Sequence, residues 1–381
     1  MELKVNEKRI EEIIKIAKRD NNTKRNFLLV NSLQGKHIPT SPKETFNLFE
    51  KLNKKNMALL KEKNILIIGF SETATAIATS YAVNLLKQAK KIYLLLTTRE
   101  KDIYGNYLTF SEIHSHAIEQ RLYIDKLEKI VDTIDEIIFI EDEITTGNTI
   151  LNLIKVLEER YSKNIKYKAI SFFNGMMDEN IQNFKKKNIE IYCLLKIFNM
   201  NYEKYLNEYS YLGKKIKKLN QAISKELKIE NIAISGYQNS RECLDIEDYK
   251  KSCENFIETL LEKSYMKNFK RMLVLGTEEF MYLPLLFASK LEQDGKEIKF
   301  HATTRSPILP SQEKEYPLKS RFELESLYER GRKTFIYNLE KYDKVFIIHD
   351  SKNLNINGLN NLLNALYSVG NRDISVVHWE E

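Results

Sequence analysis

Residues 137–149 carry the clearest chemistry in this 381-residue chain. An apolar run, Ile137–Ile140, delivers two adjacent carboxylates, Glu141 and Asp142, and a short turn then opens a helix. A helix N-terminus presents unpaired N–H groups and the positive end of its dipole, so it favours a phosphate. The carboxylates accept hydrogen bonds from neutral hydroxyl groups. A ligand with a phosphate at one end and a vicinal diol beside it, such as ribose 5-phosphate, satisfies both.

The turn supplies the remaining groups. Gly147 allows the backbone to approach a phosphate closely. Thr145, Thr146 and Thr149 add hydroxyl donors around it. The alternative is an ordinary strand end followed by a capped helix start.

Two further turns follow apolar runs in the same way. GFSETAT, Gly69–Thr75, lies between a predicted strand and a predicted helix, and it is either a ligand loop or a helix start capped by Ser71 or Thr73. Thr97, Thr98 and Arg99 end the next run. The guanidinium fork suits a phosphate group, although a surface arginine would look the same.

Two loops contain histidine. FSEIHSHAIEQR contains His114 and His116, and histidine is a residue type that can donate protons near neutral pH or stabilise a departing anion. No further pattern completes a metal site around them, and a solvated loop is the alternative. In GKHIPTSP, Lys36 and His37 are candidates for contacting a second substrate.

The elements that position these residues alternate between short apolar runs and helices. Continuous apolar runs of this kind predict a parallel sheet covered on both faces, with ligands at the carboxyl ends of the strands. Helices are predicted over 1–20, 43–62, 73–86, 118–131 and 149–159, strands over 27–30, 64–69, 92–95, 137–140, 167–173 and 189–195, and an irregular segment over 101–117.

Residues 201–268 interrupt this rhythm and predict charged helices that act as a connector. The alternation resumes at Met272, and three segments resemble earlier ones in the same order. Gly69 matches Gly276, Thr98-Arg99 matches Thr304-Arg305, and Glu141-Asp142 matches His349-Asp350, at offsets of 207, 206 and 208 residues. This pattern favours a duplication in which the second copy has lost the Thr-Thr-Gly turn.

The second copy gathers its own polar residues at predicted strand ends. They are Thr277, Glu278, Thr304, Arg305 and Asp350. Either this copy binds a ligand of its own, or it serves as a scaffold that packs like a partner.

Bulk composition agrees with a globular chain of about two domains. The net charge of +7 arises from 60 basic and 53 acidic residues and permits anionic ligands or nucleic acid without choosing between them. The three cysteines form no C-x-x-C pair, the N-terminus has no apolar signal core, and no run is long enough to span a membrane. We expect a cytoplasmic protein without a membrane partner.

The run IFIEDEITTGNT resembles the phosphoribosyl pyrophosphate motif of type I phosphoribosyltransferases. The resemblance implies that Glu141 and Asp142 bind the ribose hydroxyls, that residues 71–74 grip pyrophosphate, and that Thr98 and Arg99 contact it. It also implies a mobile loop at His114 and His116 and an acceptor-recognising hood within residues 27–42. The implied phosphate cradle is Thr145, Thr146, Gly147, Asn148 and Thr149, and the implied pyrophosphate loop is Ser71, Glu72, Thr73 and Ala74.

The whole chain is similar to a narrower group, in which a domain resembling orotate phosphoribosyltransferase precedes a domain named after Thr-Arg-Ser-Pro, here Thr304–Pro307. Genes of this group are associated with bacterial tellurite-resistance and stress-response clusters. Glu141 departs from the commonest pattern of two aspartates, but a longer carboxylate still accepts from a hydroxyl. We therefore expect an α/β type I phosphoribosyltransferase fold with a hood over 1–200, a helical connector over 201–268, and a related but degenerate α/β domain over 269–381.

The resemblance implies Mg²⁺-dependent transfer of 5-phosphoribosyl from phosphoribosyl pyrophosphate to a nitrogen acceptor, with catalytic roles for Glu141, Asp142, Arg99, His114 and His116. Mg²⁺ would bind mainly through substrate oxygens, with no direct protein ligand. The alternative is a regulator that senses phosphoribosyl pyrophosphate or a nucleotide and binds nucleic acid or protein, for which GKKIKKLN, Gly213–Asn220, is the candidate surface. Either a homodimer or an internal pseudo-dimer fits two related halves.

Overall fold

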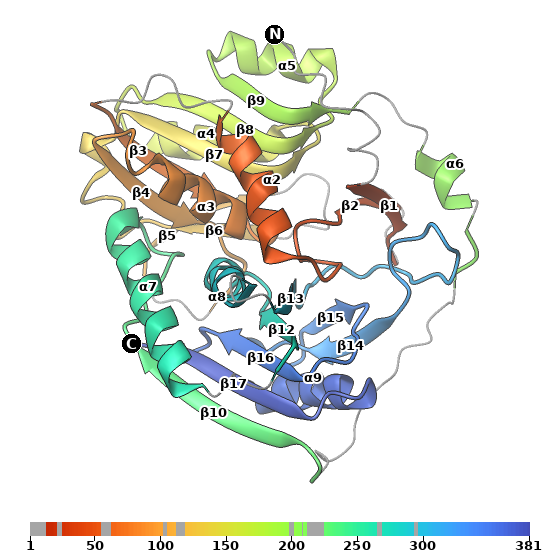
Figure 1. The fold of residues 1–381 in the computed structure, drawn as a ribbon. Helices are drawn as coiled ribbons and strands as arrows, with labels where there is room; N and C mark the ends of the chain where they lie inside the picture. Colours follow the sequence, from red (N-terminus) through yellow and green to blue (C-terminus); the bar gives the residue numbers. More distant parts are fainter. Residues whose placement is uncertain are drawn as a thin grey trace. The chain divides into compact units, whose positions relative to one another are not determined.

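The computed structural model describes most of the chain. The described residues are 13–20, 25–54, 62–101, 105–111, 119–197, 202–207, 209–211, 225–264, 269–292 and 296–381. The chain forms two compact units (Figure 1). The six-stranded unit contains Phe46–Met200 and Gly236–Glu258, and the five-stranded unit contains Met1–Thr45, Asn201–Ser235 and Thr259–Glu380. The α/β fold class predicted from the sequence is confirmed in both.

The sheet of the six-stranded unit has the order β11-β4-β3-β7-β8-β9. Its five long strands run parallel, and β11 is antiparallel to β4. The strands are β3 (Asn64–Gly69), β4 (Lys91–Leu96), β7 (Glu136–Ile144), β8 (Lys166–Asn174), β9 (Glu190–Lys196) and β11 (Leu244–Asp245). The helices are α2 (Pro42–Lys54), α3 (Thr75–Leu85), α4 (Asn148–Arg160), α5 (Asp178–Lys186) and α7 (Ile246–Lys263); α2 and α7 each contribute residues to both units.

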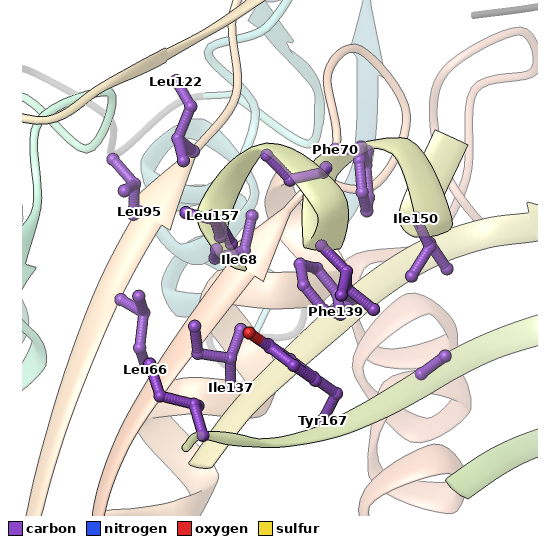
Figure 2. Close-up of a cluster of buried hydrophobic side chains, with 14 of the residues drawn as sticks. Leu66, Ile68, Phe70, Leu95, Leu122, Ile137, Phe139, Ile150, Leu157 and Tyr167 are labelled. Atoms are coloured by element: carbon purple, nitrogen blue, oxygen red, sulfur yellow. The ribbon is translucent and has the colours of Figure 1, made fainter. Parts of the chain in front are cut away.

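The core of this unit follows from alternation along the strands. Leu66, Ile68, Ile137 and Phe139 point to one face and pack with the apolar residues of α4 (Figure 2). Helix α3 contacts β3, β4 and β7 and is buried along almost its whole length. Burial on both faces explains why these strands are continuous apolar runs, and it fixes the carboxyl ends of β3, β4 and β7 beside one another.

The five-stranded unit has the sheet order β10-β17-β16-β12-β13, with every pair parallel. Its strands are β10 (Lys228–Ser235), β12 (Arg271–Gly276), β13 (Glu297–Ala302), β16 (Lys344–His349) and β17 (Asp373–Glu380), with helices α8 (Tyr282–Glu292) and α9 (Ile356–Ser368). This unit also contains two hairpins and a short helix. The hairpins are β1 (Ile14–Lys18) with β2 (Phe27–Asn31) and β14 (Arg321–Glu325) with β15 (Lys333–Tyr337), and the helix is α6 (Tyr202–Asn207).

The two sheets share one strand order. Strands β13-β12-β16-β17 repeat β4-β3-β7-β8, and β10, which precedes the others in the chain, takes the place of β9. In each unit a hairpin is inserted after the second strand, β5 (Tyr107–Ser111) with β6 (Glu119–Tyr123) in one and β14 with β15 in the other. The turns agree as well, since Thr98 bridges to Arg121 and Thr304 bridges to Phe335. The second domain is therefore related to the first in topology.

Several local predictions were wrong. Residues 14–18 and 119–123 are strands rather than helices, residues 107–111 are a strand rather than irregular, and 228–235 is a sheet strand within the predicted helical connector. In each case a partner strand supplies the hydrogen bonds, and in the three segments predicted as helical this pairing prevailed over local helix preference. In β10, for example, Ile232 and Ile234 are buried between exposed neighbours. None of the helices in the described ranges is long and apolar enough to cross a membrane.

Candidate active site

The carboxyl ends of β3, β4 and β7 carry most of the predicted site residues. Strand β7 extends through Glu141 and Asp142 to the buried Ile144, and α4 begins at Asn148. The intervening turn holds Thr145, Thr146 and Gly147. The Asn148 N–H approaches Thr146 Oγ1 at 3.3 Å, while the first turn of α4 contains no acidic residue. These features leave the start of α4 suited to an anion.

Gly147 has a structural reason to be glycine. Its φ is 76°, in the left-handed region. A Cβ at this position would lie 2.4 Å from the ring of Phe184 and 3.0 Å from the sulfur of Met176. Any side chain would therefore both strain the backbone and displace the turn from the core.

A hydrogen bond joins two of the predicted subsites. Thr73, in the loop after β3, donates from Oγ1 to Oδ1 of Asp142 at 2.6 Å. Burial raises the pKa of Asp142 to about 6, and this hydrogen bond opposes the increase. The site thus holds a carboxylate that ionises near neutral pH beside a loop expected to bind pyrophosphate.

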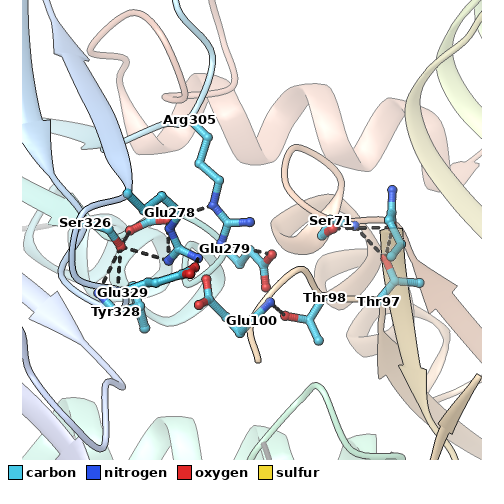
Figure 3. Close-up of polar contacts among 12 residues, drawn as sticks. Ser71, Thr97, Thr98, Glu100, Glu278, Glu279, Arg305, Ser326, Tyr328 and Glu329 are labelled. Atoms are coloured by element: carbon cyan, nitrogen blue, oxygen red, sulfur yellow. Dashed lines mark hydrogen bonds and ion pairs between the residues drawn. The ribbon is translucent and has the colours of Figure 1, made fainter. Parts of the chain in front are cut away.

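The loop after β3 is held by Thr97, which the sequence analysis noted, and by Gln120, which it did not. The Ser71–Glu72 peptide is cis. The Ser71 N–H donates to Thr97 Oγ1 at 2.8 Å, and the Thr97 hydroxyl donates to Oε1 of buried Gln120 at 2.6 Å (Figure 3). Gln120 comes from the β5–β6 hairpin, far along the chain, so no local pattern indicated this contact.

The helix after the loop begins with a buried hydroxyl. Thr75 is 2% exposed, and its Oγ1 has no hydrogen-bond partner among the described residues. Ala74 precedes it without a capping side chain. A ligand oxygen at the loop would supply an acceptor for this donor, which would otherwise be costly to bury.

At the end of β4, Thr98 is buried and its Oγ1 accepts from the Glu100 N–H at 3.0 Å; Arg99 lies between them. His114 and His116 fall outside the described residues, as does the basic segment at 213–220. Lys36 and His37, predicted for the hood, are both buried in the five-stranded unit, where the Lys36 amine donates to the carbonyl oxygens of Glu278 and Thr303.

The candidate residues of the second domain are brought together in two groups. Arg305 Nε donates to Glu278 Oε2 at 2.7 Å, and Arg332 and Ser326 also contact that buried carboxylate (Figure 3). The hydroxyl of Tyr328 lies 2.6 Å from Thr277 Oγ1 and 2.7 Å from Asp350 Oδ1. Thr304 pairs with β15. Ser326, Tyr328 and Arg332 lie between β14 and β15, in a segment that the sequence analysis did not single out.

A family model described as phosphoribosyl transferase matches residues 13–201, and a model described as the TRSP domain C-terminal to that transferase matches residues 240–366. A search of curated proteins returns no match. Solved structures with similar segments include adenine phosphoribosyltransferase from Trypanosoma brucei, at 13% identity over 50% of this chain and 78% of that one, with a TM-score of 0.36. Another is the enzyme from Leishmania tarentolae, at 16% identity over 50% and 86%, also with a TM-score of 0.36.

The two family models match the chain in the order that the motifs indicated, and the parallel sheets provide the strand ends that those motifs require. This chain belongs to the family of phosphoribosyl transferases that carry a TRSP domain after the transferase domain.

Proposed function

We propose that the six-stranded unit binds phosphoribosyl pyrophosphate and transfers its 5-phosphoribosyl group to a nitrogen atom of a small acceptor, releasing pyrophosphate. The contact between Thr73 and Asp142 carries this proposal, because it unites the pyrophosphate loop with the carboxylates expected to bind the ribose diol. In this assignment Thr145–Thr149 hold the 5′-phosphate and Ser71–Ala74, Thr98 and Arg99 hold pyrophosphate. His114 and His116 are proposed to act near the departing group.

The chemistry requires charge stabilisation more than a nucleophile. The bond from ribose C1 to pyrophosphate breaks as the bond to the acceptor nitrogen forms, so positive charge develops on the ribose and negative charge on pyrophosphate. Glu141 and Asp142 orient the diol and stabilise the positive charge on the ribose. Loop N–H groups and Arg99 stabilise the negative charge on pyrophosphate. The acceptor releases its proton to a nearby base or to water.

We propose Mg²⁺ as the cofactor. We expect substrate oxygens and water to hold Mg²⁺, with no direct protein ligand, since Mg²⁺ usually keeps several waters in its shell. No group of three or more His, Cys, Asp or Glu within the described ranges is arranged to hold a metal ion. When bound with the substrate, Mg²⁺ would supply positive charge at the leaving pyrophosphate. We also propose a cytoplasmic location, which the buried thiols of Cys243 and Cys253, neither of them in a disulfide, support.

The test is calorimetric titration of the purified protein with phosphoribosyl pyrophosphate, with and without Mg²⁺. Binding that requires Mg²⁺ is the expected result, and pyrophosphate release with an acceptor would then establish transfer. Binding without release for any acceptor would favour the regulatory alternative, whereas no binding under either condition would refute the site.

The affinity for phosphoribosyl pyrophosphate should rise with pH. With a pKa of about 6, Asp142 is mostly protonated at pH 5 and mostly ionised at pH 7. The ionised carboxyl accepts stronger, charge-assisted hydrogen bonds from the diol than the protonated one does, so binding at pH 5 should be about tenfold weaker than at pH 7. Titration across this range checks the slope, with ribose 5-phosphate in parallel to separate the ionisation of Asp142 from that of pyrophosphate. Equal affinities for ribose 5-phosphate at the two pH values, after allowance for its phosphate, would contradict the role of Asp142.

Replacing Thr97 by valine should loosen the pyrophosphate loop. Valine keeps the shape of threonine but removes the hydroxyl that accepts from Ser71 and donates to Gln120. We expect faster amide hydrogen exchange at residues 71–74 and roughly tenfold weaker binding of pyrophosphate, as for the loss of one or two hydrogen bonds. Thr133→Val, an exposed threonine of the same unit, is the control. Unchanged exchange and unchanged affinity in Thr97→Val would show that this network does not support the loop.

A further inference from the structure

The six-stranded unit includes a segment that the chain reaches only after β10. Leu244 and Asp245 form β11 and pair antiparallel with Leu94 and Tyr93 of β4. Upstream, the Ser240 carbonyl accepts from the Leu96 N–H at 2.8 Å. Since the segment runs opposite to β4, residues 237–239 lie beyond the last residue of that strand. They therefore lie at the edge of the sheet where Thr97–Arg99 are placed.

The five-stranded unit contains the counterpart of this segment. Thr40 forms an antiparallel bridge with Phe300 of β13, the strand that matches β4. Thr40 and Leu244 are 204 residues apart, close to the spacing of the duplicated motifs, and they precede α2 and α7 respectively. Each half of the chain thus contributes the residues before its first long helix to the sheet edge formed by the other half. Residues 34–39 correspond to 238–243.

The counterpart shows what such a segment reaches. Lys36 donates to the carbonyl oxygens of Glu278 and Thr303, and the Gly35 carbonyl lies 2.8 Å from Nδ1 of His301. Glu278 and Thr303 match Ser71 and Thr97 of the six-stranded unit. Their shared contact confirms the match, because the Glu278 N–H donates to Thr303 Oγ1 at 3.0 Å, as that of Ser71 does to Thr97. A segment in this position therefore lies against the loop after the first strand.

We propose that residues 237–241 recognise the acceptor at the transferase site, in the role that the sequence suggested for residues 27–42. This inference rests on the proposed function. The inference follows from the exchange of segments between the two units. Lys36 and His37 belong to the five-stranded unit, whereas Gly236–Glu258 belong to the unit that contains Asp142.

The side chains of this segment indicate the class of acceptor. Tyr237 carries an aromatic ring and donates from its hydroxyl to Asn239 Oδ1 at 3.2 Å, while Arg241 is buried and donates from Nη1 to the Tyr237 hydroxyl at 3.3 Å. A guanidinium only donates hydrogen bonds, and an aromatic ring favours a planar partner. The acceptor class is a planar nitrogen heterocycle that presents a carbonyl or carboxylate oxygen.

The experiment measures how much the base adds to binding. The full-length protein is titrated with ribose 5-phosphate and with UMP, IMP and AMP. We expect UMP or IMP to bind at least tenfold more tightly than ribose 5-phosphate, and AMP to gain less. In Tyr237→Leu and Arg241→Met this gain should fall to about twofold or less while the affinity for ribose 5-phosphate stays unchanged. Arg241→Lys is the milder variant if Arg241→Met does not fold, and Glu247→Gln, at an exposed position in the first turn of α7, is the control.

Three results would overturn the inference: no gain from any base in the wild-type protein, a gain that survives in both variants, or a gain that is lost in His37→Leu instead. Loss of the gain in His37→Leu would instead assign acceptor recognition to residues 27–42. Failure of ribose 5-phosphate itself to bind would contradict the proposed function rather than this assignment.

Discussion

Asp142→Asn should abolish most of the affinity for phosphoribosyl pyrophosphate while leaving the protein at least as stable as the wild type. The carboxylate of Asp142 is expected to accept charged hydrogen bonds from the ribose diol, and an amide accepts only neutral ones. A loss of about 1.5–3 kcal/mol, or roughly 10–150-fold in the dissociation constant, follows. Calorimetric titration at pH 7 measures it.

The same substitution should increase the free energy of unfolding, because Asp142 is buried. The folded state raises the pKa of Asp142 from 3.8 to about 6. Between these two pKa values the folded state binds the proton more tightly than the unfolded state does. The free energy of unfolding therefore falls as pH rises through this interval. The asparagine variant avoids this cost, so its free energy of unfolding at pH 7 should be higher by up to about 3 kcal/mol.

Asp132→Asn, at an exposed position of the same unit, is the matched control and should alter neither quantity. Weaker binding together with clear destabilisation in Asp142→Asn would indicate a structural carboxylate instead. Unchanged binding would remove Asp142 from the site.

Gly147→Ala should destabilise the six-stranded unit and weaken phosphate binding together. The alanine would have to adopt a φ near 76°, and its Cβ would lie 2.4 Å from the Phe184 ring. The backbone conformation costs about 1 kcal/mol and the steric conflict about 1–3 kcal/mol more. Because the turn must move, we expect at least tenfold weaker binding of ribose 5-phosphate. Thermal unfolding and calorimetry measure the two effects.

Gly331 is a matched control for the backbone alone. Its φ is 79°, and a Cβ there would meet nothing within 4 Å, so Gly331→Ala should cost only about 1 kcal/mol. The double variant Gly147→Ala with Phe184→Leu should recover part of the stability, since leucine is smaller than the aromatic ring. If Gly147→Ala costs no more than Gly331→Ala, the contact with Phe184 does not constrain the turn.

The sequence alone was sufficient for features carried by contiguous residues. The strand, turn and helix around Ile137–Thr149 lie within one short stretch, so the apolar run, the paired carboxylates and the glycine were visible together. The same holds for the apolar runs that became β3, β4, β7, β12 and β16. Buried parallel strands need apolar residues on both faces, and that requirement leaves a direct trace in the sequence.

Features that depend on distant partners were decided by the tertiary structure. Strands β1, β6 and β10 are short or charged, and each became a strand because a neighbour supplied its hydrogen bonds. The network from Ser71 through Thr97 to Gln120 joins three separate segments. The exchange of residues 13–45 and 236–258 between the two units likewise depends on sheet edges that are distant in the chain. The local sequence of such a segment does not show whether it pairs with a sheet edge of its own half of the chain or of the other half.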